Sequence, residues 1–177
     1  PKIKWKPGNM VYPVPAVIVT CGKSPEDYNA ITIAWTGTIC SDPPMTYISV
    51  RPHRHSYPII KKDMAFVINL TTVPMTYATD FIGVRSGKDL NKLEACHLTY
   101  QLSEHHGIPM LKDSPVSIEC EVTQIIPLGT HDMFLAKVVS VWVDDKYMDE
   151  TQRFHLDRSL PICYSNGYYH SLGKSLG

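Results

Sequence analysis

Two arginines and a serine follow a strand-like segment directly, in the stretch Arg51-Pro-His-Arg-His-Ser56. Guanidinium groups bind phosphate oxygens through several N–H donors of fixed geometry, and backbone amides at a helix N-terminus also favour anions. Arg51 and Arg54 supply charge, Ser56 is a good cap for a following helix, and His53 and His55 are further candidate donors. The spacing predicts a site for a phosphate group. The alternative is a solvated basic loop at the end of a strand.

The segment before this loop, residues 29–39, alternates in side-chain size. Successive side chains of a strand point to opposite faces. The large apolar set is expected to enter a core and comprises Ile31, Ile33, Trp35 and Ile39. The other face is small and carries hydroxyls, from Ala30, Thr32, Ala34, Thr36 and Thr38. Because nothing bulky obstructs such a face, a flat polar ring can lie against it, close to Asn29. The alternative explanation of the threonines is their general preference for strands, which requires no ligand.

Three further residues each have two interpretations. Alternation places Trp35 on the core face, unless a bulge at Gly37 turns it toward the small face. Asn69 lies inside an apolar strand, where a buried amide either ties the structure together or contacts a ligand. His131 lies in the turn before the last long strand, and such a histidine either acts on a ligand or is an ordinary surface residue.

Metal and nucleophile chemistry find little support in the sequence. His97, His105 and His106 lack a carboxylate or cysteine at ligand spacing, and no GxSxG motif is present. The five cysteines are widely spaced and odd in number, which argues against a zinc site or a disulfide framework and favours a reduced, cytoplasmic setting. Glu119 and Glu121 alternate with apolar residues, so both are expected to face solvent or a partner subunit.

The elements that position these residues are mostly strands. Strand signals cover residues 16–21, 29–39, 45–50, 66–70, 116–126 and 134–143, and short helical signals cover 56–62, 76–82 and 90–96. Residues 97–114 and the tyrosine-bearing tail show few regular signals. Many strands, brief helices and no alternating βαβ pattern predict an all-β-dominated, antiparallel barrel in a single domain over residues 1–177.

The charge of the chain is balanced, with 17 basic and 17 acidic residues. That balance argues against a broad nucleic-acid-binding surface, which needs a basic excess. No apolar run reaches the length of about 18 residues that indicates a membrane span. The N-terminal residues also lack the apolar core of a secretory signal. Neither nucleic acid nor a membrane is an expected partner.

The order of motifs resembles the flavin reductase-like family of FMN-binding split barrels, which includes flavoredoxins. The residues that carry this resemblance are PVPAVIVT (13–20), the strand starting at Asn29, SDPP (41–44), SVRPHRHSY (49–57), INL (68–70), SGKDLNK (86–92), SPVSIECEV (114–122), GTH (129–131) and YYHSLG (168–173). The resemblance implies a six-stranded Greek-key barrel that forms a homodimer and binds FMN non-covalently near the subunit interface. It departs from the family where Glu26-Asp27-Tyr28 replaces the usual Asp-Gly turn and where Lys88 replaces an arginine.

Together, the residues and the resemblance point to a set of site residues. The expected FMN-binding residues are Asn29, Ala30, Thr32, Trp35, Thr36, Arg51, Arg54, His55, Ser56, Asn69 and Lys92. His131 matches a family position near the flavin ring, where it is expected to orient a nicotinamide or protonate the flavin. The expected activity is electron transfer from NADH or NADPH to flavin, to a redox partner protein or to a small acceptor. The alternatives are a flavin-bound electron carrier or store without a nicotinamide site, and a barrel that has lost its cofactor.

Overall fold

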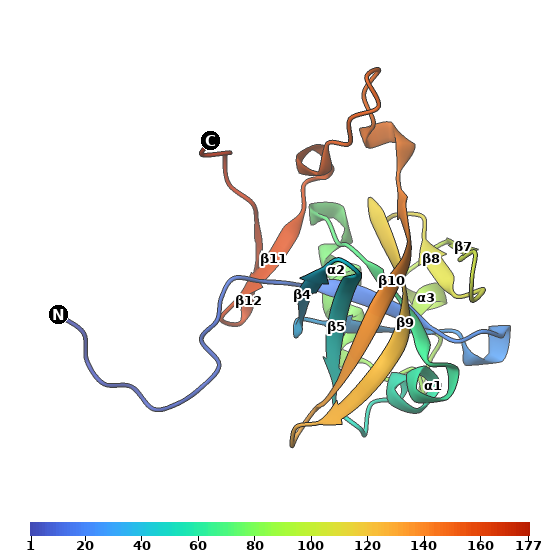
Figure 1. Ribbon diagram of the computed structural model, residues 1–177, viewed down its shortest axis with the longest axis horizontal. Helices are drawn as coiled ribbons and strands as arrows, with labels where there is room; N and C mark the ends of the chain where they lie inside the picture. The colour runs from blue at the N-terminus through green and yellow to red at the C-terminus, as the bar shows by residue number, and fades with distance from the viewer.

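The computed structural model describes residues 1–177, and its centre is one antiparallel sheet of seven strands in the order β3-β2-β6-β9-β10-β5-β4 (Figure 1). The strands of this sheet are β2 (Val17–Cys21), β3 (Asn29–Ile33), β4 (Thr36–Ser41), β5 (Pro44–Val50), β6 (Ala65–Asn69), β9 (Val116–Pro127) and β10 (Asp132–Val143). Each predicted strand is present, and bounds differ by two residues or fewer except within 29–39. No helix is long and apolar enough to cross a membrane.

The predicted single strand over residues 29–39 is broken at Ala34 and Trp35. β3 pairs with β2 and β4 pairs with β5, so two consecutive strands occupy opposite edges of the sheet. The Ser49 amide donates to the Trp35 carbonyl oxygen at 3.0 Å, so the pairing of β4 with β5 extends back to Trp35, and β3 at the other edge also contacts β5. A chain that passes from one edge to the other must leave the ladder between them. The sheet therefore closes into a barrel with a seam at residues 34–35.

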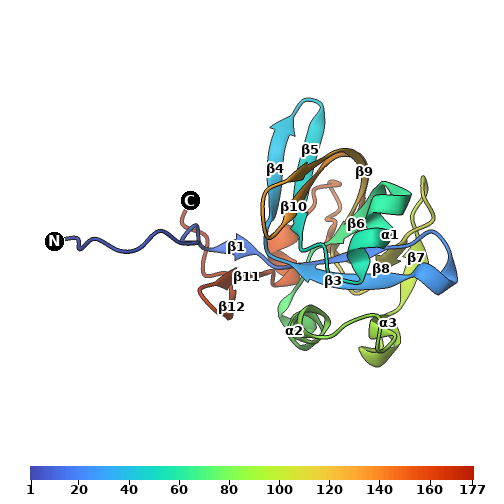
Figure 2. The ribbon, with the colours of Figure 1, turned by 90° about the horizontal axis from the view of Figure 1, so that it is seen from below.

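The interior of the barrel contains the apolar face of β3. Ile31 and Ile33 are buried with Phe66 and Phe134 in the main core cluster, as their alternation predicts. Ile39 is not in the core, because 43% of it is exposed. It lies on the edge strand β4, where the register with β5 shifts between Thr38 and Cys40, and the β4–β5 hairpin projects beyond the barrel (Figure 2).

Two helices cover the small face of β3, which corrects the expectation that this face is bare. α2 (Thr76–Val84) and α3 (Lys92–Ala95) lie on the same side of β3 (Figure 2). Ala30 is fully buried in a second core cluster with Ala78 and Ile82 of α2. Thr32 donates from Oγ1 to the Thr79 carbonyl oxygen at 2.5 Å. The side chains are small because the helix packs closely on the strand.

Asn69 is a structural tie inside the barrel. Its Nδ2 donates to the Ile18 carbonyl oxygen and to Thr20 Oγ1, at 2.9 and 3.0 Å. Its Oδ1 accepts from the Leu111 amide and from Ser117 Oγ, at 3.0 and 2.8 Å. These four bonds use the whole hydrogen-bonding capacity of an amide side chain. Of the two interpretations, the structure therefore favours the tie over contact with a ligand.

Glu119 is fully buried, so the expectation that it faces solvent or a partner subunit is wrong. A hairpin of β7 (Tyr100–Leu102) and β8 (Pro109–Leu111), in the segment expected to be irregular, places its loop over β9. The Glu119 carboxylate accepts hydrogen bonds from Ser103, Ser140 and the His105 and His106 amides. Burial raises the pKa of Glu119, but these donors outweigh burial and leave the pKa below its ordinary value.

The C-terminal region also contains a hairpin, of β11 (Ile162–Ser165) and β12 (Tyr168–Ser171), in a tail where few elements were predicted. It pairs with the short strand β1 (Val14–Pro15) in a separate three-stranded sheet. The turn residues Asn166 and Gly167 have φ values of 47° and 97°. Asn-Gly at these two left-handed positions is a strong two-residue hairpin signal, and it was present in the sequence.

Candidate functional site

A cavity of about 160 Å³ lies at the seam of the barrel. It is bounded by the residues where β3 ends, by the residues that follow β5 and by the β9–β10 turn. Five of the predicted site residues line it, namely Thr32, Trp35, Arg51, Arg54 and His131. Trp35 reaches this cavity because the strand breaks at the seam and not through a bulge at Gly37. The structure thus brings together residues from three separate segments of the chain.

Arg54 is half-buried and is held against the C-terminal end of α2. Its Nη1 and Nη2 both donate to the Gly83 carbonyl oxygen, each at 3.1 Å. Burial lowers the pKa of Arg54. Arg51 is exposed, and no side-chain hydrogen bond fixes it. None of the salt bridges in the protein involves an arginine, so neither charge is neutralised by a carboxylate.

Lys92 provides a third cation beside Arg54, and only 3% of it is exposed. Its Nζ donates to the carbonyl oxygens of Ala30 and Ile82, at 2.8 and 2.9 Å. Burial and, next, the positive charge of Arg54 lower the pKa of Lys92 to about 8. The carbonyls at a helix C-terminus carry about half a negative charge. They cannot balance two full positive charges, so this corner of the protein favours an additional anion.

Ser56 and Asn29 lie behind these cations and bond to each other. Asn29 Nδ2 donates to Ser56 Oγ at 2.7 Å, and both residues are buried. Ser56 also lies beside the buried thiol of Cys21. It is the first residue of α1 (Ser56–Asp63), whose N-cap is the exposed His55. The prediction that Ser56 caps this helix is therefore wrong by one position, because Ser56 is used to anchor the loop.

Seven predicted residues do not line the seam cavity: Asn29, Ser56 and Lys92 lie behind it, and four lie elsewhere. Ala30 and Asn69 are in the interior, and His55 is on the surface. Thr36 is buried, and its Oγ1 donates to the Tyr47 carbonyl oxygen at 2.7 Å, within the β4–β5 ladder. Ala30 nevertheless contributes through its backbone, because its carbonyl oxygen holds Lys92.

His131 is half-buried at the edge of the cavity, and its Nδ1 lies 2.8 Å from Thr130 Oγ1. Burial and, next, the nearby charge of Arg51 lower the pKa of His131. A histidine with a lowered pKa is neutral at pH 7, so its ring has one donor and one acceptor nitrogen. The adjacent Asp132 is already engaged, because Tyr57 donates to its Oδ2 at 2.5 Å. His131 is thus the titratable group free to meet a ligand here.

Two glycines contribute to the site although they were not predicted. A Cβ on Gly83 would lie 3.3 Å from Thr32 Cβ, so this glycine lets the C-terminal end of α2 approach β3. A Cβ on Gly87 would lie 2.1 Å from Asn29 Oδ1, so only glycine allows the 85–91 loop to cover Asn29. An isolated glycine within a helical or loop pattern is the only sequence signal for such close approach.

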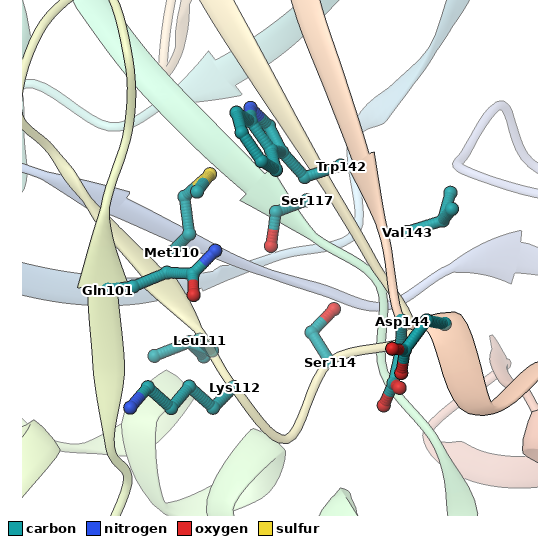
Figure 3. A pocket seen from close by; sticks show the side chains of 10 residues that line it. Gln101, Met110, Leu111, Lys112, Ser114, Ser117, Trp142, Val143 and Asp144 are labelled. Atoms are coloured by element: carbon teal, nitrogen blue, oxygen red, sulfur yellow. The ribbon is translucent and has the colours of Figure 1, made fainter.

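A different cavity, of about 330 Å³, lies between the β7–β8 hairpin and the upper ends of β9 and β10 (Figure 3). The Trp142 and Met110 side chains lie at one end of it, and Asp144 lies at the other. None of the predicted site residues lines this cavity. Its size therefore does not make it the better candidate for the predicted chemistry.

The barrel fold has close counterparts among known proteins. Residues 9–173 match the family model described as the flavin reductase like domain, and the chain belongs to that family. The solved structure of flavoredoxin of Desulfovibrio vulgaris (Miyazaki F) superposes with a TM-score of 0.91 at 24% identity, covering 99% of this chain and 96% of that one. This likeness confirms the predicted fold.

Relatives with similar sequences include a rubredoxin and an FMN reductase. A high molecular weight rubredoxin of Moorella thermoacetica is 28% identical over 139 residues, which are 77% of this chain and 53% of the rubredoxin. An FMN reductase (NADH) of Serratia proteamaculans is 21% identical over 159 residues, which are 90% of this chain and 82% of that protein.

Proposed function

We propose that this protein binds FMN non-covalently at the seam of the barrel and uses it to transfer electrons from NADH or NADPH to an acceptor. The observation that carries the proposal is that Arg51 and Arg54 line one cavity and Lys92 lies beside Arg54, with no carboxylate paired to any of them. The phosphate of FMN carries between one and two negative charges at neutral pH. Such a group would balance the positive charge of these three side chains, which the protein alone leaves unneutralised.

The residues that line the cavity and those that lie behind it each have a defined task in this proposal. Arg51, Arg54 and Lys92 hold the phosphate, and Asn29 and Ser56 fix the loop that carries the arginines. Thr32, Ala34 and Trp35 form the surface on which the flavin ring lies. His131 remains neutral and supplies a hydrogen-bonding nitrogen at the ring edge. Bound FMN itself supplies the capacity to accept and release electrons, which no side chain of this site has.

A second candidate function is a flavin-bound electron carrier without a nicotinamide site. The structural likeness to a flavoredoxin and the match to part of a longer rubredoxin favour it. The similarity to an FMN reductase (NADH) favours the first candidate. The two functions share the phosphate site and differ only in whether a nicotinamide reaches the ring.

Absorbance spectroscopy tests the proposal and separates the two candidates. We expect the protein to bind FMN with a Kd at or below the micromolar range, and we expect the bound flavin absorbance to bleach when NADH or NADPH is added without oxygen. Bleaching by a reduced low-potential redox protein but not by a nicotinamide would favour the carrier. A protein that binds no FMN at micromolar concentration would contradict both.

A further inference from the structure

A second cavity, of about 290 Å³, lies next to the seam cavity and shares part of its wall. Thr32 and Ala34 line both cavities. The rest of the second wall comes from α2, through Asp80, Gly83 and Val84, and from the β11–β12 hairpin, through Tyr164, Gly167 and Tyr169. The hairpin and α2 lie on the same side of the barrel in Figure 2.

Aromatic rings form one side of this second cavity. Tyr164 packs edge-to-face against Tyr169, with ring centroids 5.7 Å apart, and against Tyr12, at 6.2 Å. Such mutual packing holds the rings in fixed orientations. The walls of the cavity are thus suited to a flat ring, which tyrosine rings and small side chains contact over a large area.

The only charged side chain of the second cavity is a carboxylate. Asp80 is exposed and forms no salt bridge. Burial and, next, the negative charge of Asp80 raise the pKa of Tyr169 to about 12, so the Tyr169 hydroxyl stays protonated. Arg85, at the end of α2, packs over the ring of Phe81 at 5.6 Å. No cationic side chain lines this cavity.

The two cavities therefore have opposite electrostatic character on either side of Thr32 and Ala34. We propose that the second cavity is a binding subsite for a flat aromatic molecule that is neutral or positively charged, and that Asp80 discriminates against anionic rings. Tyr164 and Tyr169 contact the ring faces or edges, and a cation also gains from the tyrosine π-systems. The claim that the bound molecule lies beside the flavin rests on the proposed function. The claim that it binds in this cavity is independent of that function.

Three probes of nearly identical shape test the charge preference, namely benzamidine (positive), benzamide (neutral) and benzoate (negative). Each is titrated into the FMN-loaded protein at low ionic strength, and backbone amide shifts are followed by NMR. We expect the shifts to concentrate at Gly83, Gly167 and Tyr169. We also expect benzamidine to bind at least about fivefold more tightly than benzoate. The Asp80 carboxylate attracts the first and repels the second, and solvent screens both interactions in part.

Variants identify the residues responsible. Asp80→Asn is expected to bring the benzamidine-to-benzoate affinity ratio close to one, whereas Asp113→Asn, at an exposed carboxylate elsewhere, leaves the ratio unchanged. Tyr169→Ala is expected to weaken all three probes by a similar factor. Equal binding of benzamidine and benzoate, no effect of Asp80→Asn, or shifts that map to Arg51 and His131 instead would each overturn the proposal.

The failure of this proposal is distinguishable from the failure of the proposed function. FMN is titrated separately, and the three probes are also titrated into the FMN-free protein. A protein that binds benzamidine at Gly167 and Tyr169 but does not bind FMN supports this subsite and contradicts the proposed function. A protein that binds FMN normally but none of the probes contradicts the subsite alone.

Discussion

Arg54 and Lys92 bind neighbouring carbonyl oxygens, those of Gly83 and Ile82, at the C-terminal end of α2. The two cations come from segments 38 positions apart in the sequence and repel each other, as the lowered pKa of Lys92 reports. A pair of like charges held together in this way weakens the free protein and strengthens the binding of an anion.

The first prediction concerns the phosphate. Arg51→Ala is expected to weaken FMN binding by about 10- to 100-fold, because a charge-assisted hydrogen bond contributes about 1.5–3 kcal/mol. Riboflavin, which lacks the phosphate, is expected to lose less than about threefold. Fluorescence titration of both flavins measures the difference. Arg158→Ala, at an exposed arginine outside the cavity, is the control, and equal losses for FMN and riboflavin would place Arg51 away from the phosphate.

The second prediction concerns the pH dependence of stability. The pKa of Lys92 falls from 10.5 to about 8 on folding, so the unfolded chain binds more protons between these values. The free energy of unfolding contributed by Lys92 therefore rises as the pH increases from about 8 to about 10.5, by up to about 3 kcal/mol. Urea unfolding of the FMN-free wild type and of Lys92→Met measures this. The stability difference between them should shift in favour of the wild type across that window, and a flat difference would contradict the prediction.

The third prediction concerns the loop that covers Asn29. Gly87→Ala is expected to lower the free energy of unfolding by about 1–3 kcal/mol, because the added methyl meets Asn29 Oδ1 and forces a shift. The Asn29–Ser56 hydrogen bond should break, so FMN affinity is expected to fall as well. Gly173→Ala, where no atom lies within 4 Å of an added Cβ, is the matched control. Thermal unfolding compares the variants, and equal stability would show that the loop can relax.

The fourth prediction concerns the buried carboxylate. Glu119→Gln is expected to lower the free energy of unfolding at pH 7 by about 2 kcal/mol, because hydrogen bonds to an ionised group are replaced by weaker ones. The pKa of Glu119 is lowered in the folded state. Its contribution is therefore present above the ordinary glutamate pKa and is lost as the pH falls through the folded value. Urea unfolding between pH 7 and pH 3 should show the gap between wild type and variant closing in acid.

The fifth prediction concerns assembly. We propose that a second copy of the chain covers the edge strand β4, on which Ile39 is 43% exposed, because unpaired apolar edges rarely stay open to solvent. Light scattering after size exclusion should give about twice the mass of one chain, and Ile39→Lys should shift it toward the monomer. Leu128→Lys, at an exposed turn residue, should not. A wild-type monomer that retains FMN would contradict an interfacial site.

Local patterns predicted most strands and the cationic loop correctly. Alternation identified the buried face of β3, the types of Arg51 and Arg54 indicated a binding loop, and the family resemblance indicated His131; the fold brings all three residues to one cavity. Long-range packing was beyond such patterns. The small face of β3 reflects the approach of α2 as well as any ligand, and Glu119 is buried because a hairpin folds over it. Neither contact has a signature in the local sequence. The Asn166-Gly167 turn does have such a signature, and this turn joins the two strands that carry Tyr164 and Tyr169 of the second cavity.

The seam has a consequence for the lengths of chain that this protein can accept. Only Ala34 and Trp35 connect the two edges of the sheet. One inserted residue there would loosen the packing of the two edges, and it would also reverse which side chains of β4 face inward. The tip of the β4–β5 hairpin, near Asp42 and Pro43, projects away from the barrel and carries no such restriction. A change of length at that tip leaves the closure of the barrel unchanged, whereas the two residues at the seam should be left at their present length.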